Sequence, residues 1–345
     1  MPQNKNANVL VAAVHDVRPF VTLLRAVNFN ATAAIVISSA GLTIAVEDAK
    51  MLVAKAYAPC EMFDEYDYSP RNEDALSAEE PDDNDEEPSL IFHIHLDTVL
   101  ECLNIFGTGS ATLLYGNNDN KRRKKQWAGL SDDSNEEQPN GVRKEKKVAP
   151  PKGNTTLDQF FFSGEGKKTG MRMTYAGQGH PLVLILGEDA AGPITTCEIE
   201  TIEEDGVTEL AFDDSLNSPS SWIKQSSWLS DSLLELDPSC EKLTFLGIPA
   251  TEKSKATLRI TAEGTFGSTQ MDYPYDRDVL ETFECAQFVK FTYRVAHIAS
   301  ALKAMQTSLK TSLRIDPDGL LSLQFMMATG LGIFIEFRCL PLVEE

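Results

Sequence analysis

The sequence lacks long apolar runs, paired cysteines and an excess of positive charge. No stretch of the 345 residues is apolar enough over roughly 18 residues to span a membrane, so we expect no membrane contact. The six cysteines are widely spaced without a Cys-x-x-Cys pair, which favours reduced, packed thiols over a disulfide framework or a zinc site. The net charge is −21, so the chain as a whole is unlike proteins that hold DNA through its phosphates.

Motifs of catalysis are also scarce. The sequence has no Gly-x-x-x-x-Gly-Lys-[Ser/Thr] loop for nucleotide phosphates, no Gly-x-Ser-x-Gly and no convincing Cys/His nucleophile, and we expect no cofactor. His93 and His95 form a His-x-His pair without an evident third ligand, so we interpret them as packed or surface histidines. Acids at Asp213-Asp214 and at Asp272, Asp276 and Asp278 keep a two-metal 3′–5′ exonuclease as an alternative, although no predicted strand carries the Asp-x-Glu pair typical of such enzymes.

Two long polar stretches interrupt the chain. Residues 69–88 contain nine acids and three prolines, a composition that predicts a solvated acidic loop. Residues 107–168 are rich in Asn, Gly, Ser, Pro, Lys and Glu, and are too long for an ordinary loop within a compact domain. We interpret this second stretch as a disordered insertion.

Outside these stretches, the same order of predicted elements occurs twice. Each half runs from a strand and a helix through several strands to a short helix and three final strands. The first helix extends from a cap at Asp16 to Val27, and its counterpart is a helical stretch over 218–236 that follows a strand at 208–213. The pattern predicts an α+β protein in which two similar domains each place two helices on antiparallel sheets. Their bounds are 1–200 and 209–345, with an acidic connector at 201–208.

Three segments carry a resemblance to a known family. FHIHLDTVLECLNIFG (92–107), MRMTYAGQGHPLVLIL (171–186) and LRITAEGTFGSTQMDYP (258–274) resemble the Rad-one subunits of the heterotrimeric DNA-damage checkpoint clamp, within the sliding clamps of the proliferating-cell-nuclear-antigen type. The resemblance extends over nearly the whole chain except 69–88 and 107–168. It implies a nuclear, non-enzymatic subunit of a ring of three different subunits around double-stranded DNA. A dedicated clamp loader would place the ring at damage for checkpoint signalling, repair and meiosis. A homotrimeric replicative clamp is the other alternative.

The resemblance also implies which side chains face DNA. Arg18 and Arg25 are seven residues apart on the first predicted helix, so they share the face opposite its apolar stripe. Lys224 and Lys303 are the corresponding candidates in the second half. The helix at 96–105 turns acids outward, so we expect weak and uneven DNA contact around the ring; the alternative is that all four are ordinary surface charges.

Partner peptides are expected at a hydrophobic pocket beneath the connector. By resemblance, this pocket would receive docking peptides of repair proteins, and its walls would be Leu42, Ile44, Leu340 and Pro341.

The insertion contains two kinds of short motif. Asn154, Leu157, Phe160 and Phe161 follow the clamp-docking pattern Gln-x-x-aliphatic-x-x-aromatic-aromatic, with Asn in place of Gln. The alternative is that these phenylalanines begin a buried strand. Two basic clusters, KRRKK and RKEKK, are typical of nuclear import signals. The first cluster comprises Lys121, Arg122, Arg123, Lys124 and Lys125.

Overall fold

A computed structural model describes most of the chain outside the two polar stretches. The described residues are 8–70, 89–107, 168–188, 192–204, 206–213, 220–223, 225–252, 254–276, 278–328 and 333–343. The motif at 154–161, both basic clusters and Lys224 lie outside them. Across the described ranges, no helix is long and apolar enough to cross a membrane.

In its described residues, the first half of the chain contains two α-helices and nine strands. In order they are β1 (Leu10–Val14), α1 (Arg18–Val27), β2 (Thr32–Ser38), β3 (Gly41–Asp48), β4 (Leu52–Pro59), a 3-10 turn (Cys60–Met62), β5 (Glu65–Tyr68), β6 (Leu90–His95), α2 (Leu96–Leu103), β7 (Gly170–Tyr175), β8 (Leu182–Gly187) and β9 (Ile194–Ile199).

The second half follows after the connector. Its elements are β10 (Ser220–Ile223), α4 (Ser226–Leu234), β11 (Lys242–Ile248), β12 (Thr257–Gly264), β13 (Gly267–Pro274), β14 (Leu280–Glu284), β15 (Val289–Arg294), α5 (Val295–Ser300), α6 (Leu302–Thr307), β16 (Ser308–Ile315), β17 (Leu321–Met327) and β18 (Phe334–Cys339). The described chain is therefore a mixed fold of a few short helices and many strands.

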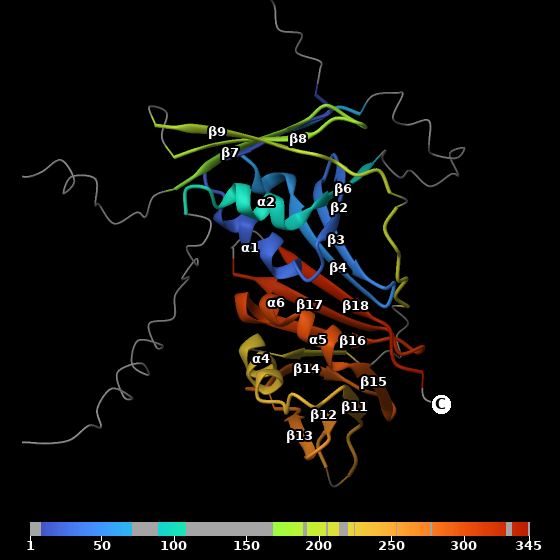
Figure 1. The fold of residues 1–345 in the computed structure, drawn as a ribbon. Helices are drawn as coiled ribbons and strands as arrows, with labels where there is room; N and C mark the ends of the chain where they lie inside the picture. Colours follow the sequence, from blue (N-terminus) through green and yellow to red (C-terminus); the bar gives the residue numbers. More distant parts are fainter. Residues whose placement is uncertain are drawn as a thin grey trace, which may run out of the picture. The chain divides into compact units, whose positions relative to one another are not determined.

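The strands form three antiparallel sheets. A five-stranded sheet has the order β5-β1-β7-β8-β9, and a four-stranded sheet has the order β13-β12-β11-β15. The third sheet has nine strands in the order β14-β10-β16-β17-β18-β4-β3-β2-β6, so it takes strands from both halves of the chain. Figure 1 shows this sheet running from the blue strands of the first half into the red strands of the second.

The helices lie together on one side of the nine-stranded sheet. Helix α1 is strongly amphipathic because its buried residues recur at helical spacing. It packs on β3, β4 and β18, and it also contacts α2 and α6, while α6 contacts α4. The contacts define a row of helices, α2-α1-α6-α4, which Figure 1 shows along one face of the strands.

One apolar core extends through both halves. Beneath the helix row, Phe337 on β18 lies against Phe29 and Phe325, with ring centroids 5.9 and 5.8 Å apart. Phe337 is 1% exposed. The burial of large side chains from both halves around one ring explains why the two halves form a single packed body at this sheet.

The structure differs from the predicted elements at the start of the second half. Residues 208–213 form no ladder, and the predicted helix over 218–236 is a strand, β10, followed by the shorter helix α4. Ser-Pro is a helix-start signal, but β10 pairs with both β14 and β16, and this tertiary pairing overrides the local preference. At α1, the N-cap residue is Val17 and not the predicted Asp16. The Asp16 side chain still accepts a hydrogen bond from the backbone N–H of Arg18, the first residue of the helix, at 3.0 Å.

Candidate functional site

The two halves of the chain meet where β4 pairs with β18. The register runs from Ile335 opposite Ala56 to Cys339 opposite Leu52. On one face of this junction every side chain is buried: Leu52, Ala54, Ala56, Ile335, Phe337 and Cys339. Strands β9 and β13 occupy the same places in the five-stranded and four-stranded sheets as β18 and β4 do in the nine-stranded sheet, but no other described strand pairs with their outer edges.

The segment that crosses the nine-stranded sheet on the face away from the helices is longer than the connector predicted at 201–208. Its described residues are 200–204 and 206–213, and the name connector is used for all of them from here on. It begins at the edge strand β6, where His93 and Ile202 exchange backbone hydrogen bonds of 2.9 and 2.7 Å. It then contacts β3, β4, β18 and β16 in turn. The contacts are Thr208 N to Glu47 Oε2 at 3.3 Å, Glu209 to Lys55 at 3.6 Å, Leu210 O to Arg338 Nη1 at 2.7 Å, and the Phe212 ring 4.8 Å from the Arg314 guanidinium.

A buried carboxylate anchors the middle of the connector. Glu336 accepts hydrogen bonds from Ser322 at 2.7 Å and from Gln324 at 3.3 Å, and it forms an ion pair with Arg338 at 3.0 Å. Burial alone would raise the pKa of Glu336, but the hydrogen bonds from Arg338 and Ser322 outweigh it and hold the pKa below its usual value. Because Arg338 also donates to the Leu210 carbonyl, the charge pair fixes the connector to the sheet.

A polar pocket of about 260 Å³ lies beneath the start of the connector. Its lining residues come from α1's C-terminal loop, β2, β3, β6 and the connector: Asn30, Thr32, Ala34, Ala45, Glu47, Ala49, His93, Glu204, Gly206 and Val207. His93 is 8% exposed, while His95 on the same strand is exposed, because the connector covers only the first of them. The His-x-His spacing alone could not show which of the two histidines is buried, because that depends on where the connector lies. The acidic run that identifies the connector was the available sequence signal.

The predicted walls of a hydrophobic pocket do not come together at the surface. Leu42 and Ile44 are 1% and 0% exposed and belong to the apolar core, so they offer no surface to a peptide. Leu340 and Pro341 are partly exposed, and the Leu340 N–H donates to Met51 O at 2.9 Å. In β3 the residues that alternate with Leu42 and Ile44 face the connector instead, and one of them is the charged Glu47.

The helix row carries few exposed positive charges. Arg18 is part-buried and makes a two-pronged contact with Asp16, including Nε to Oδ1 at 2.9 Å, so its charge is largely neutralised. Arg25 is half-buried. Lys303 is exposed, but its Nζ donates to Asn28 O at 3.1 Å, at the C-terminal end of α1. The exposed acids on the same helices are Asp97, Glu101 and Asp231.

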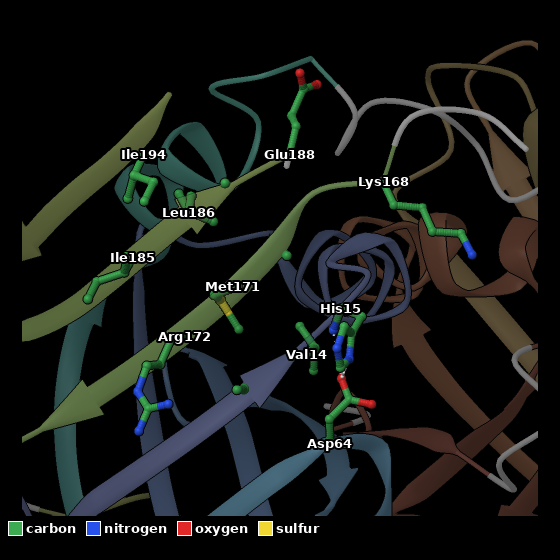
Figure 2. Close-up of a pocket in the computed structure, with 13 residues that line it drawn as sticks. Val14, His15, Asp64, Lys168, Met171, Arg172, Ile185, Leu186, Glu188 and Ile194 are labelled. Atoms are coloured by element: carbon green, nitrogen blue, oxygen red, sulfur yellow. Dashed lines mark hydrogen bonds and ion pairs between the residues drawn. The ribbon is translucent and has the colours of Figure 1, made fainter. Parts of the chain in front are cut away.

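A second hollow, a cleft of about 400 Å³, lies at the end of the five-stranded sheet (Figure 2). His15 Nδ1 and Asp64 Oδ2 lie 2.5 Å apart on one side of it, and Arg172 pairs with Glu65 at 2.8 Å. Ile185 and Ile194 contribute exposed apolar surface beside the unpaired edge of β9. His15, Asp64 and Arg172 of the cleft are thus paired, and its apolar part adjoins an edge of β9 that no other described strand covers.

The acids considered for metal-dependent catalysis lie on separate elements. Asp272 on β13 accepts two hydrogen bonds from Arg259, at 2.6 and 3.0 Å, and these contacts lower its pKa. Asp276 accepts the backbone N–H of Asp278, and Asp213 lies at the end of the described connector. In the described ranges, no three His, Cys, Asp or Glu side chains gather closely enough to hold a metal ion.

Two of the cysteines, Cys102 and Cys339, have thiols that are poorly suited to nucleophilic chemistry. All six cysteines are free, and burial raises the pKa of Cys339 to about 12. Burial together with the neighbouring thiol of Cys197 raises the pKa of Cys102 to about 11. A thiol with so high a pKa is protonated near neutral pH and is a poor nucleophile.

Sequence patterns did not reveal an apolar row on the outer face of the nine-stranded sheet. Met326, Phe334 and Tyr57 lie side by side on β17, β18 and β4, and the rings of Tyr57 and Phe334 are 6.4 Å apart. Phe334 and Met326 are 45% and 41% exposed. Strand alternation predicts such side chains only once the neighbours in the sheet are known.

A fold of antiparallel sheets with a row of helices on one face is compatible with the clamp-like architecture that the sequence predicts. Comparison with known proteins gives the family: residues 9–327 match the model of the family described as Repair protein Rad1/Rec1/Rad17. The match covers most of the chain, which therefore belongs to this family of repair proteins.

Relatives of known name match either nearly the whole chain or about half of it. The chain is 28% identical to the human "Cell cycle checkpoint protein RAD1" over 334 residues, which are 96% of this chain and 91% of the relative. It is 35% identical to the fission yeast "DNA damage checkpoint control protein rad1" over 50% of this chain and 52% of that protein. It is 26% identical to the "DNA repair exonuclease REC1" of Mycosarcoma maydis over 92% of this chain and 87% of that protein.

Proposed function

We propose that this chain is a non-enzymatic subunit of a ring of three different subunits that encircles double-stranded DNA and acts in the DNA-damage checkpoint and in repair. The observation that carries the proposal is the internal correspondence of the two halves around the β4–β18 junction. Family membership and the checkpoint names of the human and fission yeast relatives support the biological role.

The two halves correspond strand by strand. The five-stranded sheet and the block β14-β10-β16-β17-β18 place their elements in the same order along the chain, and the block β4-β3-β2-β6 corresponds likewise to β13-β12-β11-β15. This correspondence supports two similar clamp domains joined by the connector. It is a correspondence of strand order and does not depend on identical residues in the two halves. A domain pair of this kind presents one joined strand pair and two open edges.

The β4–β18 junction serves as a template for contacts between subunits. If β9 pairs with a neighbour as β18 pairs with β4, then Thr195 and Cys197 point to the buried side of the new interface. By the same correspondence, Thr269 and Met271 do so on β13. Because the two edges differ, each subunit has a direction, and head-to-tail contacts close into a ring.

The helix row is then the surface that faces DNA. Its exposed acids and its largely paired cations support a weak hold on the phosphates, which is sufficient if the ring retains DNA by encircling it. Loading by a separate clamp loader, docking of repair proteins and a nuclear location complete the proposal. Import would use the cluster at 121–125, which lies outside the described residues.

The test is the mass of the assembly formed with two candidate partner subunits. The wild-type chain is expected to be monomeric alone and to give a one-to-one-to-one ring in native mass spectrometry with both partners. Met271→Asp on β13 and Thr195→Asp on β9 place a charge at opposite edges, so each is expected to lose one neighbour and keep the other.

A matched control is Thr174→Asp on β7, an inner strand of the same sheet, where the ring should remain intact. Intact rings with both edge variants, or a homotrimer of the chain alone, would exclude the proposed arrangement.

An exonuclease is the second candidate, because the Mycosarcoma maydis relative carries that name. Incubation of the purified chain with end-labelled DNA and Mg²⁺ separates the two functions. Our proposal predicts no degradation above that of a mock purification.

A further inference from the structure

The outer face of the five-stranded sheet is apolar and hollow beside the uncovered edge of β9. Ile194, the first residue of β9, is 64% exposed. It pairs with Gly187 on β8, which in turn pairs with Gly170 on β7. Because neither glycine has a side chain, nothing in this row covers Ile194, and the cleft of about 400 Å³ opens beside it (Figure 2). Ile194 is therefore an apolar side chain that a neighbouring strand could cover.

A single charge lies further along the same face of β9. Glu198 is exposed and is the one charged residue of the strand. Its neighbour in the ladder is Val183 on β8, and no cation of the described residues pairs with it. Residues four apart on a strand share a face, so Ile194 and Glu198 point to the same side of the sheet. The edge thus presents an apolar group and a carboxylate at a fixed spacing.

The β4–β18 junction supplies the register for a strand beside β9. If β9 takes the place of β18, Ile194 takes the place of Phe334, whose ring lies 6.4 Å from that of Tyr57 on β4. Four residues further on, Glu198 then faces the position that Val53 occupies in β4. A neighbouring strand therefore has one side chain beside Ile194 and another beside Glu198.

The β13 strand of the chain itself does not fit these two positions. The same register places Asp272 beside Ile194 and Ser268 beside Glu198. Asp272 is bonded to Arg259 at 2.6 and 3.0 Å, so a second copy of the chain would set an ion pair against an apolar side chain. Ser268 offers no charge to the carboxylate. The strand that suits β9 must differ from β13 at both positions.

We propose that the β9 edge recognises a neighbouring subunit whose antiparallel edge strand carries an aromatic side chain beside Ile194 and a lysine or arginine beside Glu198. Aromatic groups pair favourably with β-branched residues across strands, and opposite charges do the same. The two contacts also fix the register, because a slip of one residue would turn both partner side chains to the other face. The inference rests on the proposed ring and deepens it by stating the chemistry of the partner at one edge.

A first test uses the full chain alone and converts β13 into the proposed partner strand. The double variant Ser268→Lys with Asp272→Tyr should associate with β9 of another copy about tenfold more tightly than the wild type, the gain of two favourable cross-strand pairs. Sedimentation velocity over a concentration series measures the association, and circular dichroism checks the fold. Addition of Glu198→Lys should cancel the gain.

The matched control carries the same two side chains in exchanged positions, Ser268→Tyr with Asp272→Lys. It should associate no more than the wild type, because the charge and the ring then face the wrong neighbours. A folded first variant that associates no more than the wild type would overturn the proposal. Equal gains in the two double variants would do the same.

A second test uses the ring formed with the two candidate partner subunits and leaves β13 unchanged. Glu198→Lys and Ile194→Asp should each weaken the contact at β9 at least about tenfold, as expected for close charge pairs and apolar contacts at an interface. Glu203→Lys, an exposed acid beyond the end of β9, should leave the assembly unchanged. A wild-type ring that both β9 variants form equally well would refute this inference and leave the ring standing. Absence of any wild-type ring would instead refute the proposed function.

Discussion

The β4–β18 junction and the open edges of β9 and β13 occupy the same position in their sheets and differ in chemistry. The junction buries Ile, Phe, Leu, Ala and Cys side chains on one face. The corresponding face of the open edges has Thr195, Cys197 and Ile199 on β9 and Thr269 and Met271 on β13, and of these only Ile199 is buried. The junction face is thus entirely apolar and buried, while the edge faces include two threonines and are mostly part-exposed.

This difference between the junction and the edges explains how the chain can be held together firmly within itself and yet, in the proposed ring, bind its neighbours reversibly. An apolar strand edge without a partner invites aggregation, and polar residues reduce that risk. The same polar residues make the contact with a neighbour weaker and more dependent on what the neighbour offers. In the proposed ring, selectivity for the correct partner would come from the edges, while the stability of the chain comes from the junction.

The largest expected effect is at the junction core. Phe337→Ala removes a ring that is 1% exposed and packed against two other phenylalanines, so it should lower the free energy of unfolding by about 3–5 kcal/mol. Met271→Ala, at the corresponding edge, should lower it by less than about 1 kcal/mol because its site is partly exposed. Urea denaturation followed by circular dichroism measures both. Similar losses for the two variants would remove the distinction between junction and edge.

A smaller effect is expected where the connector is fastened across the junction. Arg338→Met leaves the Glu336 carboxylate without its charged partner and frees Leu210 O, so unfolding should become easier by about 2–3 kcal/mol at pH 7. The lowered pKa of Glu336 means that its ionised form stabilises the wild type above the normal carboxyl pKa, and this contribution is lost as the pH falls. The gap between wild type and variant should therefore narrow from pH 7 towards about pH 3.

Denaturant titrations at a series of pH values test this expectation. Lys55→Met is the control, since Lys55 also holds the connector but through an exposed pair of 3.6 Å with Glu209. It should cause little loss at any pH. A pH-independent gap for Arg338→Met would contradict the role given to Glu336.

The smallest effect is expected on the edge strand β13. Asp272→Asn removes an exposed ion pair with Arg259, and exposed pairs contribute little, so the unfolding midpoint should scarcely move. Because the Asp272 carboxylate is already bonded to Arg259, the substitution should also leave the amount of DNA degraded in the presence of Mg²⁺ unchanged. Metal-dependent degradation by the wild type that disappears in Asp272→Asn would instead favour the exonuclease.

Much of the fold could be predicted from the sequence because its signals are local. The apolar stripe of α1 and the alternation along β2, β3 and β4 depend only on helix and strand periodicity. Strand β10 could not be recognised in the same way, because its four residues become a strand only through pairing with β14 and β16. The Ser-Pro signal before it predicted a helix instead.

The candidate sites were less predictable because they depend on what the connector covers. His93 and His95 have the same spacing and strand face, and only the bridge from His93 to Ile202 buries the first. Leu42 and Ile44 were assigned to a surface pocket by resemblance, yet strand alternation turns them to the core and turns Glu47 to the connector. None of the four wall residues expected by resemblance lines the polar pocket beneath the connector.

The nine-stranded sheet has a mechanical consequence for the proposed ring. Neighbouring strands are paired all the way from β14 through the β4–β18 junction to β6, with register shifts only in the β10–β14 and β16–β17 ladders. A force along the circumference of the ring could break the chain at the β4–β18 junction only by separating the whole ladder and exposing its buried side chains. At a subunit boundary the same force meets a more polar contact. Each chain would then behave as a stiff arc, and the ring would open at its seams.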